Sequence, residues 1–132
     1  MRFKLSAFVL LLLAGFLAAG APSAQDNLRV GILLDGPFDR NQDVTANIMR
    51  TARAALEGTR NVTFPDASRI TGDWTGSAAK AGLDRLLADD GVDVIFTLGV
   101  LGSHEAASRK NLSKPVIAPY IVQPEWLKVP SS

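Results

Sequence analysis

The stretch that decides the fold is VDVIFTL at residues 92–98, which Gly99 closes. β-Branched and aromatic residues of this kind favour a strand, and glycine tends to end one. A second short apolar run, LRVGILL at residues 28–34, is closed by the turn sequence DGP. Near-continuous apolar runs are typical of strands that are buried on both faces of a parallel sheet. We therefore expect both runs to be strands of such a sheet.

Helical periodicity separates the predicted strands. We expect a first helix over residues 41–57, a second over residues 76–89 with Thr75 as its cap, and a third over residues 103–111 with Ser103 as its cap. The apolar side of the first helix is expected to comprise Val44, Ile48, Ala52, Ala55 and Leu56.

Two further strands, at residues 61–64 and 116–118, complete the pattern, and residues 67–74 are expected to form a loop with one extended residue pair around Ile70 as an open alternative. Strands that alternate with helices predict right-handed crossovers and a parallel sheet with helices on both faces. The expected class is therefore α/β, a doubly wound parallel sheet of the Rossmann or flavodoxin type in three layers. Numbered along the chain, the four strands are expected in the order 2-1-3-4.

The N-terminus, residues 1–24, has the layout of a secretory signal peptide. Two basic residues precede an uncharged run over residues 5–19, and the small residues GAPSA follow. The apolar run is shorter than the roughly 20 residues that span a bilayer. We expect cleavage after Ser23 or Ala24, release into the periplasm, and no stable membrane insertion afterwards. An uncleaved membrane anchor is the alternative interpretation.

The remaining length suits one domain, with an α/β lobe over residues 25–122 and an irregular tail over residues 123–132. Without the leader, 12 basic and 13 acidic residues give a net charge of −1. This balance argues against a nucleic acid partner, because phosphate binding needs a clear cationic excess. The sequence has no cysteine and one histidine. Disulfides and thiolate metal sites are excluded, and no metal or cofactor is expected.

The ligand crevice of a doubly wound sheet lies at the carboxyl ends of the strands, where the strand order reverses. The loop after residues 28–34 brings Asp35, Phe38 and Arg40 to this place. Arg40 suits a bidentate contact with an anionic ligand group, and Phe38 suits stacking on an organic ligand. An ordinary polar turn is the alternative.

The second crevice loop contains Gly99, Gly102, Ser103 and His104. Glycine lets the backbone approach a ligand closely, and the amides at a helix start favour an anion such as a carboxylate. Ser103 adds a hydroxyl group, and His104 is a further candidate ligand contact. A tight turn, a helix cap and a histidine without chemistry are the alternatives.

Trp74 follows the strand predicted at residues 61–64 and is expected near the same edge of the sheet. It lines the crevice in one interpretation and packs against helices in the other. Sequence spacing assigns no Ser-His-Asp triad, and the GxSxG motif is absent. The sequence therefore favours a binding protein over an enzyme.

Several of these segments together resemble a known family. The stretches RVGILLDGPF, VDVIFTLG, GSHEA and KPVIAPYIV resemble the N-terminal lobe of a type I periplasmic solute-binding protein, the receptor of an ABC-type importer. The resemblance covers residues 28–122. It implies that two similar lobes close on a small ligand, and that Ser103 and Gly102 meet a ligand carboxylate. Since the chain supplies the length of one lobe, a fragment or a truncated product is expected.

The resemblance implies a periplasmic component of a transport system. It would bind a small organic ligand, with carboxylate-bearing compounds among the candidates, and deliver it to membrane transporter subunits. A non-catalytic adaptor in an envelope assembly is one alternative, suggested by an open sheet edge and by Trp126 in the tail. An enzyme on a Rossmann-like fold is the other, and the sequence offers no recognisable catalytic set for it.

Overall fold

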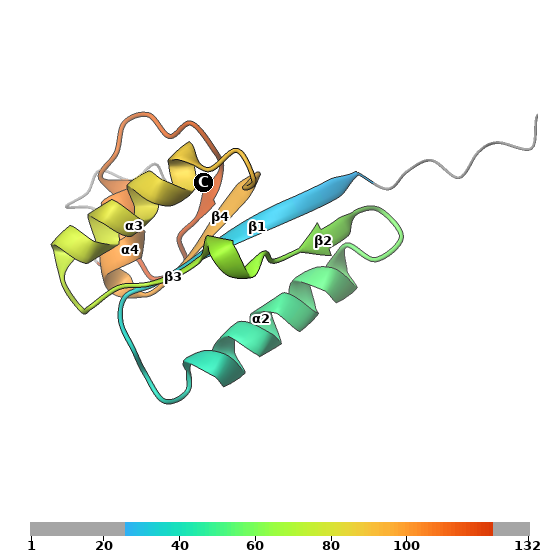
Figure 1. Cartoon of the computed structure of the whole chain (residues 1–132), viewed down its shortest axis with the longest axis horizontal. Helices are drawn as coiled ribbons and strands as arrows, with labels where there is room; N and C mark the ends of the chain where they lie inside the picture. Colours follow the sequence, from blue (N-terminus) through green and yellow to red (C-terminus); the bar gives the residue numbers. More distant parts are fainter. Residues whose placement is uncertain (1–25, 123–132) are drawn as a thin grey trace, which may run out of the picture.

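The structure is a computed structural model that describes residues 26–122. The predicted leader at residues 1–24 and the predicted tail at residues 123–132 lie outside the described residues. Figure 1 shows how the elements follow one another. They are β1 (Asn27–Leu34), α2 (Asn41–Ala55), β2 (Asn61–Thr63), the 3-10 turn η2 (Asp66–Ser68), β3 (Arg69–Thr71), α3 (Gly76–Ala88), β4 (Val94–Leu98), α4 (Val100–Ala107) and β5 (Val116–Ile117). Within residues 26–122, no helix combines the length and the apolar character that a membrane span requires.

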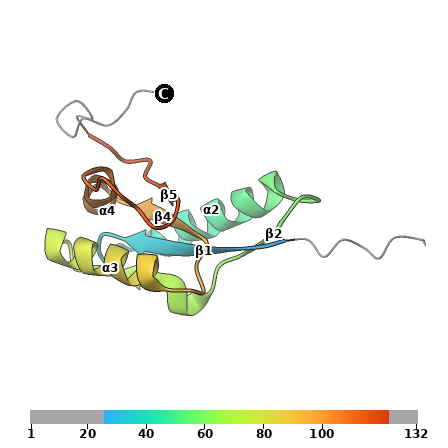
Figure 2. The ribbon, with the colours of Figure 1, turned by 90° about the horizontal axis from the view of Figure 1, so that it is seen from above.

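The strands are parallel and lie in the order β2-β1-β4-β5. β1 pairs with β4 from Val30 opposite Val94 to Leu34 opposite Leu98. β5 pairs with the other side of β4. Figure 2 shows β4 and β5 on one side of β1. The four predicted strands correspond to β1, β2, β4 and β5, and these lie in the predicted order. The α/β class is confirmed.

The sheet differs from the prediction in one strand, β3. Residues 67–74 are expected as a loop, but Arg69–Thr71 pairs with the last three residues of β1, while β2 pairs with the first three. The turn η2 lets the chain step from one half of this edge to the other. The amide of Gly72 then donates to the carbonyl of Leu34 at 2.8 Å. The extended residue pair considered around Ile70 is thus part of a strand, because β1 is long enough to pair with both β2 and β3.

Alternate residues of β1 pack against different helices, as the pleat of a strand requires. Val30, Ile32 and Leu34 belong to a core that α2 covers. Leu33 belongs to a second core, formed with Leu83 of α3 and with α4. Figure 1 shows α2 on one side of the strands and α3 with α4 on the other. The predicted three-layer arrangement is therefore confirmed.

The first helix packs on the sheet through Ile48, Ala52 and Leu56, as predicted, but two residues of the predicted apolar side face away. α2 begins at Asn41 as expected, but it buries Thr45, while Val44 is 40% exposed. Ala55 is exposed as well, and Met49 packs on the core. The predicted apolar side is therefore wrong at Val44 and Ala55. Val44 and Thr45 are neighbours at the edge of the buried face, and helical spacing alone does not decide which of them is buried.

The Asp93 carboxylate joins the start of β4 to β1. It accepts hydrogen bonds from Nε of Arg29 at 3.0 Å, from Nη2 at 2.8 Å and from the Arg29 amide at 2.8 Å. The side-chain hydrogen bonds of Arg29, followed by that of its amide, lower the pKa of Asp93 to about 2. These contacts precede the regular strand, so β4 begins at Val94 and not at the predicted Val92.

Leu83 is fully buried between α3 and the sheet. Leu83→Ala should lower the free energy of unfolding by about 2–5 kcal/mol, because the surrounding side chains fill the resulting cavity only in part. Urea denaturation followed by circular dichroism measures this loss. Val44→Ala is the control, because Val44 is exposed, and it should stay within about 0.5 kcal/mol of the wild type. Equal losses in the two variants would contradict the assigned core.

The depressed pKa of Asp93 predicts a pH dependence. Its ionised carboxylate contributes fully above the unfolded pKa of 3.8 and loses this contribution as the pH falls through the folded value of about 2. Asp93→Asn should therefore lower the melting temperature at neutral pH, and the difference from the wild type should shrink as the pH falls through this window. Thermal melts of both proteins across the window measure the difference. A difference that stays constant would argue against the Arg29–Asp93 contact.

Candidate functional site

Asp35 directly follows β1, is buried, and caps a helix from a distant part of the chain. Its two carboxylate oxygens accept hydrogen bonds from the amides of Leu101 at 2.8 Å and Gly102 at 2.9 Å. These amides lie in the first turn of α4, where backbone donors have no partner within the helix. The negative charge also lies at the positive end of the helix dipole. Asp35 therefore joins the carboxyl ends of β1 and β4.

This contact corrects the predicted start of the third helix. The sequence predicts a helix over residues 103–111 capped by Ser103, but α4 runs from Val100 to Ala107. The predicted cap is wrong because Asp35 supplies the capping carboxylate from 66 residues away. Gly99 is required by this close approach, since a Cβ at its position would collide with that carboxylate.

Ser103 lies inside α4 and has no exposed surface. Its hydroxyl oxygen lies 3.1 Å from Oγ1 of Thr97 on β4, and it accepts a hydrogen bond from the amide of Tyr120 at 3.4 Å. The side chain therefore links α4 to β4 and to the segment after β5. Since the amide of Gly102 already binds Asp35, both groups that the resemblance assigns to a ligand carboxylate are engaged within the protein.

A cavity of about 270 Å³ lies beside Asp35, at the carboxyl ends of β1 and β4. We call it the crevice. Four predicted site residues line it: Asp35, Phe38, Trp74 and Gly99. These residues come from three loops that we expect at the carboxyl ends of the strands. In the structure the three loops do lie together there.

Trp74 is held at the rim of the crevice in an unusual backbone conformation. Its φ of 68° lies in the left-handed region, which is rare for a bulky residue and costs on the order of 1–3 kcal/mol. The amide of Trp74 donates to the Asp35 carbonyl at 2.8 Å. Its indole lies against Gly36, where a Cβ would come within 2.5 Å of the ring. The residue is nevertheless 56% exposed. One part of the indole therefore packs on Gly36, and the rest is accessible to a ligand.

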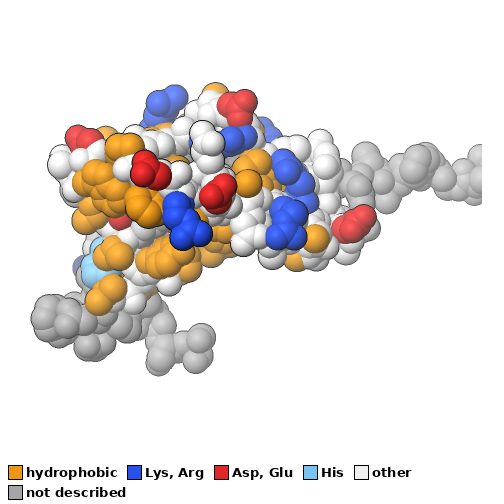
Figure 3. All heavy atoms as spheres, turned by 90° about the horizontal axis from the view of Figure 1, so that it is seen from below, with side chains coloured by type: hydrophobic (Ala, Val, Ile, Leu, Met, Phe, Trp, Pro, Cys, Tyr) orange, Lys and Arg blue, Asp and Glu red, His pale blue; other side chains and the backbone are white. Residues whose placement is uncertain are grey.

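Apolar side chains surround the crevice and stay accessible. Those that line it and are between 40% and 56% exposed are Phe38, Val44, Trp74, Val100 and Tyr120. Figure 3 shows hydrophobic side chains gathered at the end of the molecule that carries the histidine. Exposed apolar groups that cluster in this way are typical of binding surfaces.

Sequence reasoning missed three of these residues. Val44 was assigned to the helix core because its spacing suits either face. Val100 was passed over between two glycines. Tyr120 follows β5 at the same edge of the sheet as the other crevice loops, and its place at a strand's carboxyl end was a signal that could have identified it.

Four predicted site residues do not line the crevice: Gly102 and Ser103, whose contacts within the protein are described above, and His104 and Arg40. Nε2 of His104 accepts a hydrogen bond from the amide of Val122 at 3.1 Å, so the imidazole holds the segment after β5 to α4. The side chain of Arg40 is exposed in the turn before α2 and is not among the residues that line the crevice. Neither side chain is brought together with Asp35 and Trp74.

The crevice offers stacking surfaces and few free polar groups. Asp35 lies at its base, and each oxygen of that carboxylate already accepts one amide hydrogen bond. Within residues 26–122, no group of three or more metal-binding side chains is placed to hold an ion. The arrangement can therefore hold an organic ligand mainly through its flat or apolar surface.

No protein-family model, curated protein or solved structure matches the chain.

Asp35→Asn tests the cap of α4. The amide group keeps one acceptor oxygen, but its NH2 group opposes a backbone donor and the charge at the helix start is lost. We expect the free energy of unfolding to fall by about 1–3 kcal/mol, as measured by urea denaturation. Asp39→Asn is the matched control, because Asp39 is exposed in the same loop and should behave like the wild type. Unchanged stability in Asp35→Asn would refute the capping role.

Proposed function

We propose that this chain is one α/β lobe of an exported solute-binding protein, and that a small organic ligand binds in the crevice. The observation that supports it best is the set of half-exposed aromatic side chains, Phe38, Trp74 and Tyr120, around a cavity at the carboxyl edge. This edge is where doubly wound sheets bind their ligands. Binding occurs without turnover, and the loaded lobe is presented to membrane transporter subunits.

The rigidity of Trp74 favours this role. Its backbone amide is hydrogen-bonded to the Asp35 carbonyl. The next residue, Thr75, caps α3, because its hydroxyl accepts a hydrogen bond from the amide of Ala78 at 3.1 Å. The side chain of Asp73 accepts hydrogen bonds from the Thr75 amide at 3.1 Å and hydroxyl at 2.5 Å. An indole fixed before the ligand arrives loses little entropy on binding.

The chemistry of the crevice points to a ligand with a flat apolar or aromatic part. Rings of Phe38 and Trp74 suit stacking at the rim. A ligand carboxylate at the start of α4 would have to displace Asp35 from the amides of Leu101 and Gly102. We therefore propose that any charged group of the ligand points away from this helix. The exposed side of the ligand is then covered by a second lobe or a partner.

A second candidate function is an adaptor in an envelope assembly. It is favoured by exposed apolar side chains that continue beyond the crevice, at Ile117 on the edge strand β5 and at Val122 after it. On this proposal the same end of the molecule contacts another protein.

The binding proposal is tested by calorimetric titration of the purified protein with amino acids, monosaccharides and aromatic acids. We expect saturable binding by at least one aromatic compound. Trp74→Ala and Phe38→Ala should each weaken it by about two- to tenfold, the loss of one stacking contact. Trp74→Phe should lose less, because a flat ring is retained.

Arg40→Gln is the control for this series, because Arg40 is exposed beside the crevice without lining it. It should bind like the wild type. Equal weakening in Arg40→Gln and Trp74→Ala would count against a crevice ligand. Binding of an envelope protein without any small molecule would favour the adaptor.

A further inference from the structure

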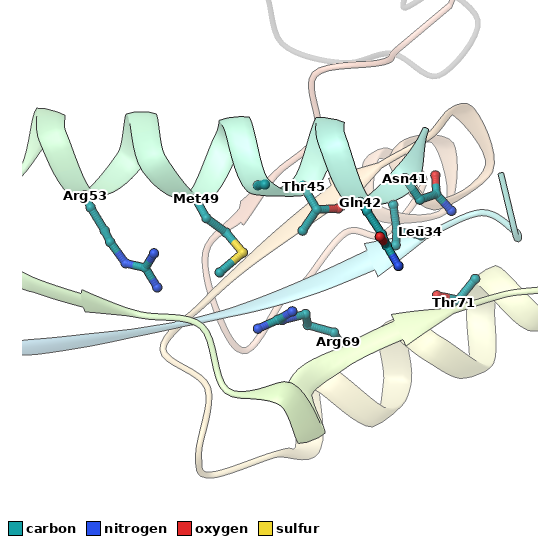
Figure 4. A pocket seen from close by; sticks show the side chains of 9 residues that line it. Leu34, Asn41, Gln42, Thr45, Met49, Arg53, Arg69 and Thr71 are labelled. Atoms are coloured by element: carbon teal, nitrogen blue, oxygen red, sulfur yellow. The ribbon is translucent and has the colours of Figure 1, made fainter. Parts of the chain in front are cut away.

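A second cavity, of about 520 Å³, lies between α2 and β3. We call it the α2–β3 groove. Figure 4 shows α2 above it and β3 below it, with Leu34 of β1 between them. Its size suits a small organic ligand. The groove depends on β3, a segment for which the sequence favours a loop.

The hydroxyl of Thr45 is the first feature that favours ligand binding in the groove. This residue is only 7% exposed. Within residues 26–122, its hydroxyl is the one buried side-chain nitrogen or oxygen without a hydrogen-bond partner. The side chain of Thr45 extends from α2 into the groove (Figure 4). Burial of an unbonded hydroxyl is unfavourable. The oxygen itself has almost no accessible surface, so a ligand oxygen would become its partner once the side chain rotates toward the groove.

Two guanidinium groups line the same groove. Arg53 of α2 lies over the ring of Phe64, 5.2 Å from its centroid, and its Nε donates to the Val62 carbonyl at 3.4 Å. Arg69 of β3 donates to the Phe64 carbonyl at 3.3 Å and pairs with Asp66 at 2.5 Å. A guanidinium has five N–H donors, so these contacts orient both groups and leave donors for a ligand. Both side chains extend into the groove (Figure 4).

The charge of the groove is positive. Among the described residues that line it, two are arginines and none is acidic. The exposed carboxylate of Asp66, outside the lining, pairs with Arg69 and offsets one of the two charges. Leu34 and Met49 supply an apolar surface beside these donors. The combination favours a ligand that is anionic at one end and apolar at the other.

We propose that the α2–β3 groove is a second ligand site, specific for a small organic oxyanion of the carboxylate or phosphate class. Arg53 and Arg69 bind the anionic group, and the Thr45 hydroxyl donates to a ligand oxygen. The groove and the crevice share only Leu34 and Asn41 among their lining residues. The proposal therefore does not depend on the crevice ligand.

The experiment is a two-dimensional amide NMR titration of the purified protein, at low ionic strength, with inorganic phosphate and separately with succinate. We expect saturable shifts at the amides of Gln42, Thr45 and Thr71, which line the groove. The indole signal of Trp74 should not shift. Tighter binding of one probe assigns the class of the anion, as phosphate or carboxylate.

Three variants make the test specific. Arg69→Gln should weaken binding about tenfold, the loss of one charge-assisted contact. Arg50→Gln removes the same charge from an exposed position on α2, where the Arg50 side chain donates a hydrogen bond to the side chain of Asn47. This variant should leave binding unchanged. Thr45→Val should weaken binding while it keeps or raises the melting temperature, because an unbonded buried hydroxyl is replaced by a methyl group.

Several outcomes would overturn the proposal. They are the absence of saturable shifts with both probes, equal weakening by Arg50→Gln and Arg69→Gln, or unchanged binding in a folded Thr45→Val. Shifts that appear only at Trp74 would assign the anion to the crevice, which also overturns the groove site. If Arg69→Gln does not fold, Thr45→Val alone decides the result.

Discussion

Two backbone amides at the start of α4 donate to the carboxylate of Asp35, and the arrangement of the carboxyl edge depends on this contact. The same residue accepts a hydrogen bond from the amide of Trp74 through its carbonyl. One residue thus fixes both α4 and the loop before α3 relative to β1. Gly99 leaves space for the carboxylate, and Gly36 leaves space for the indole. The crevice exists because these segments approach one another so closely.

The sequence was sufficient for those features that depend on neighbours in the chain. Strand composition and crossover rules predicted four strands in the right order, and topology placed the loops of Asp35, Phe38, Trp74 and Gly99 at one edge. The errors have a common cause. The start of α4 and the pairing of β3 each depend on a partner far along the chain. Periodicity carries no information about such partners.

The N-terminal half of α2 separates two cavities of different chemistry. Val44 lines the crevice with aromatic neighbours, while the next residue, Thr45, lines the groove with the arginines. Neighbouring residues on a helix point in different directions, so a single turn serves both. Asn41 borders both cavities, and its side chain donates to the Gly36 carbonyl at 2.9 Å. A small rotation of α2 would change the shape of both cavities together.

The central position of β1 has a consequence for the order in which the protein is made. Within residues 26–122, β1 is the first strand to be synthesised, yet its main partner begins beyond Asp93, a residue 64 positions after its own contact Arg29. Parallel strands have no hairpin route to pairing, and such distant contacts form slowly. Most of the first core lies within residues 28–64, whereas the second core, which includes Ile95 and Ala106, cannot close until these later residues have left the ribosome.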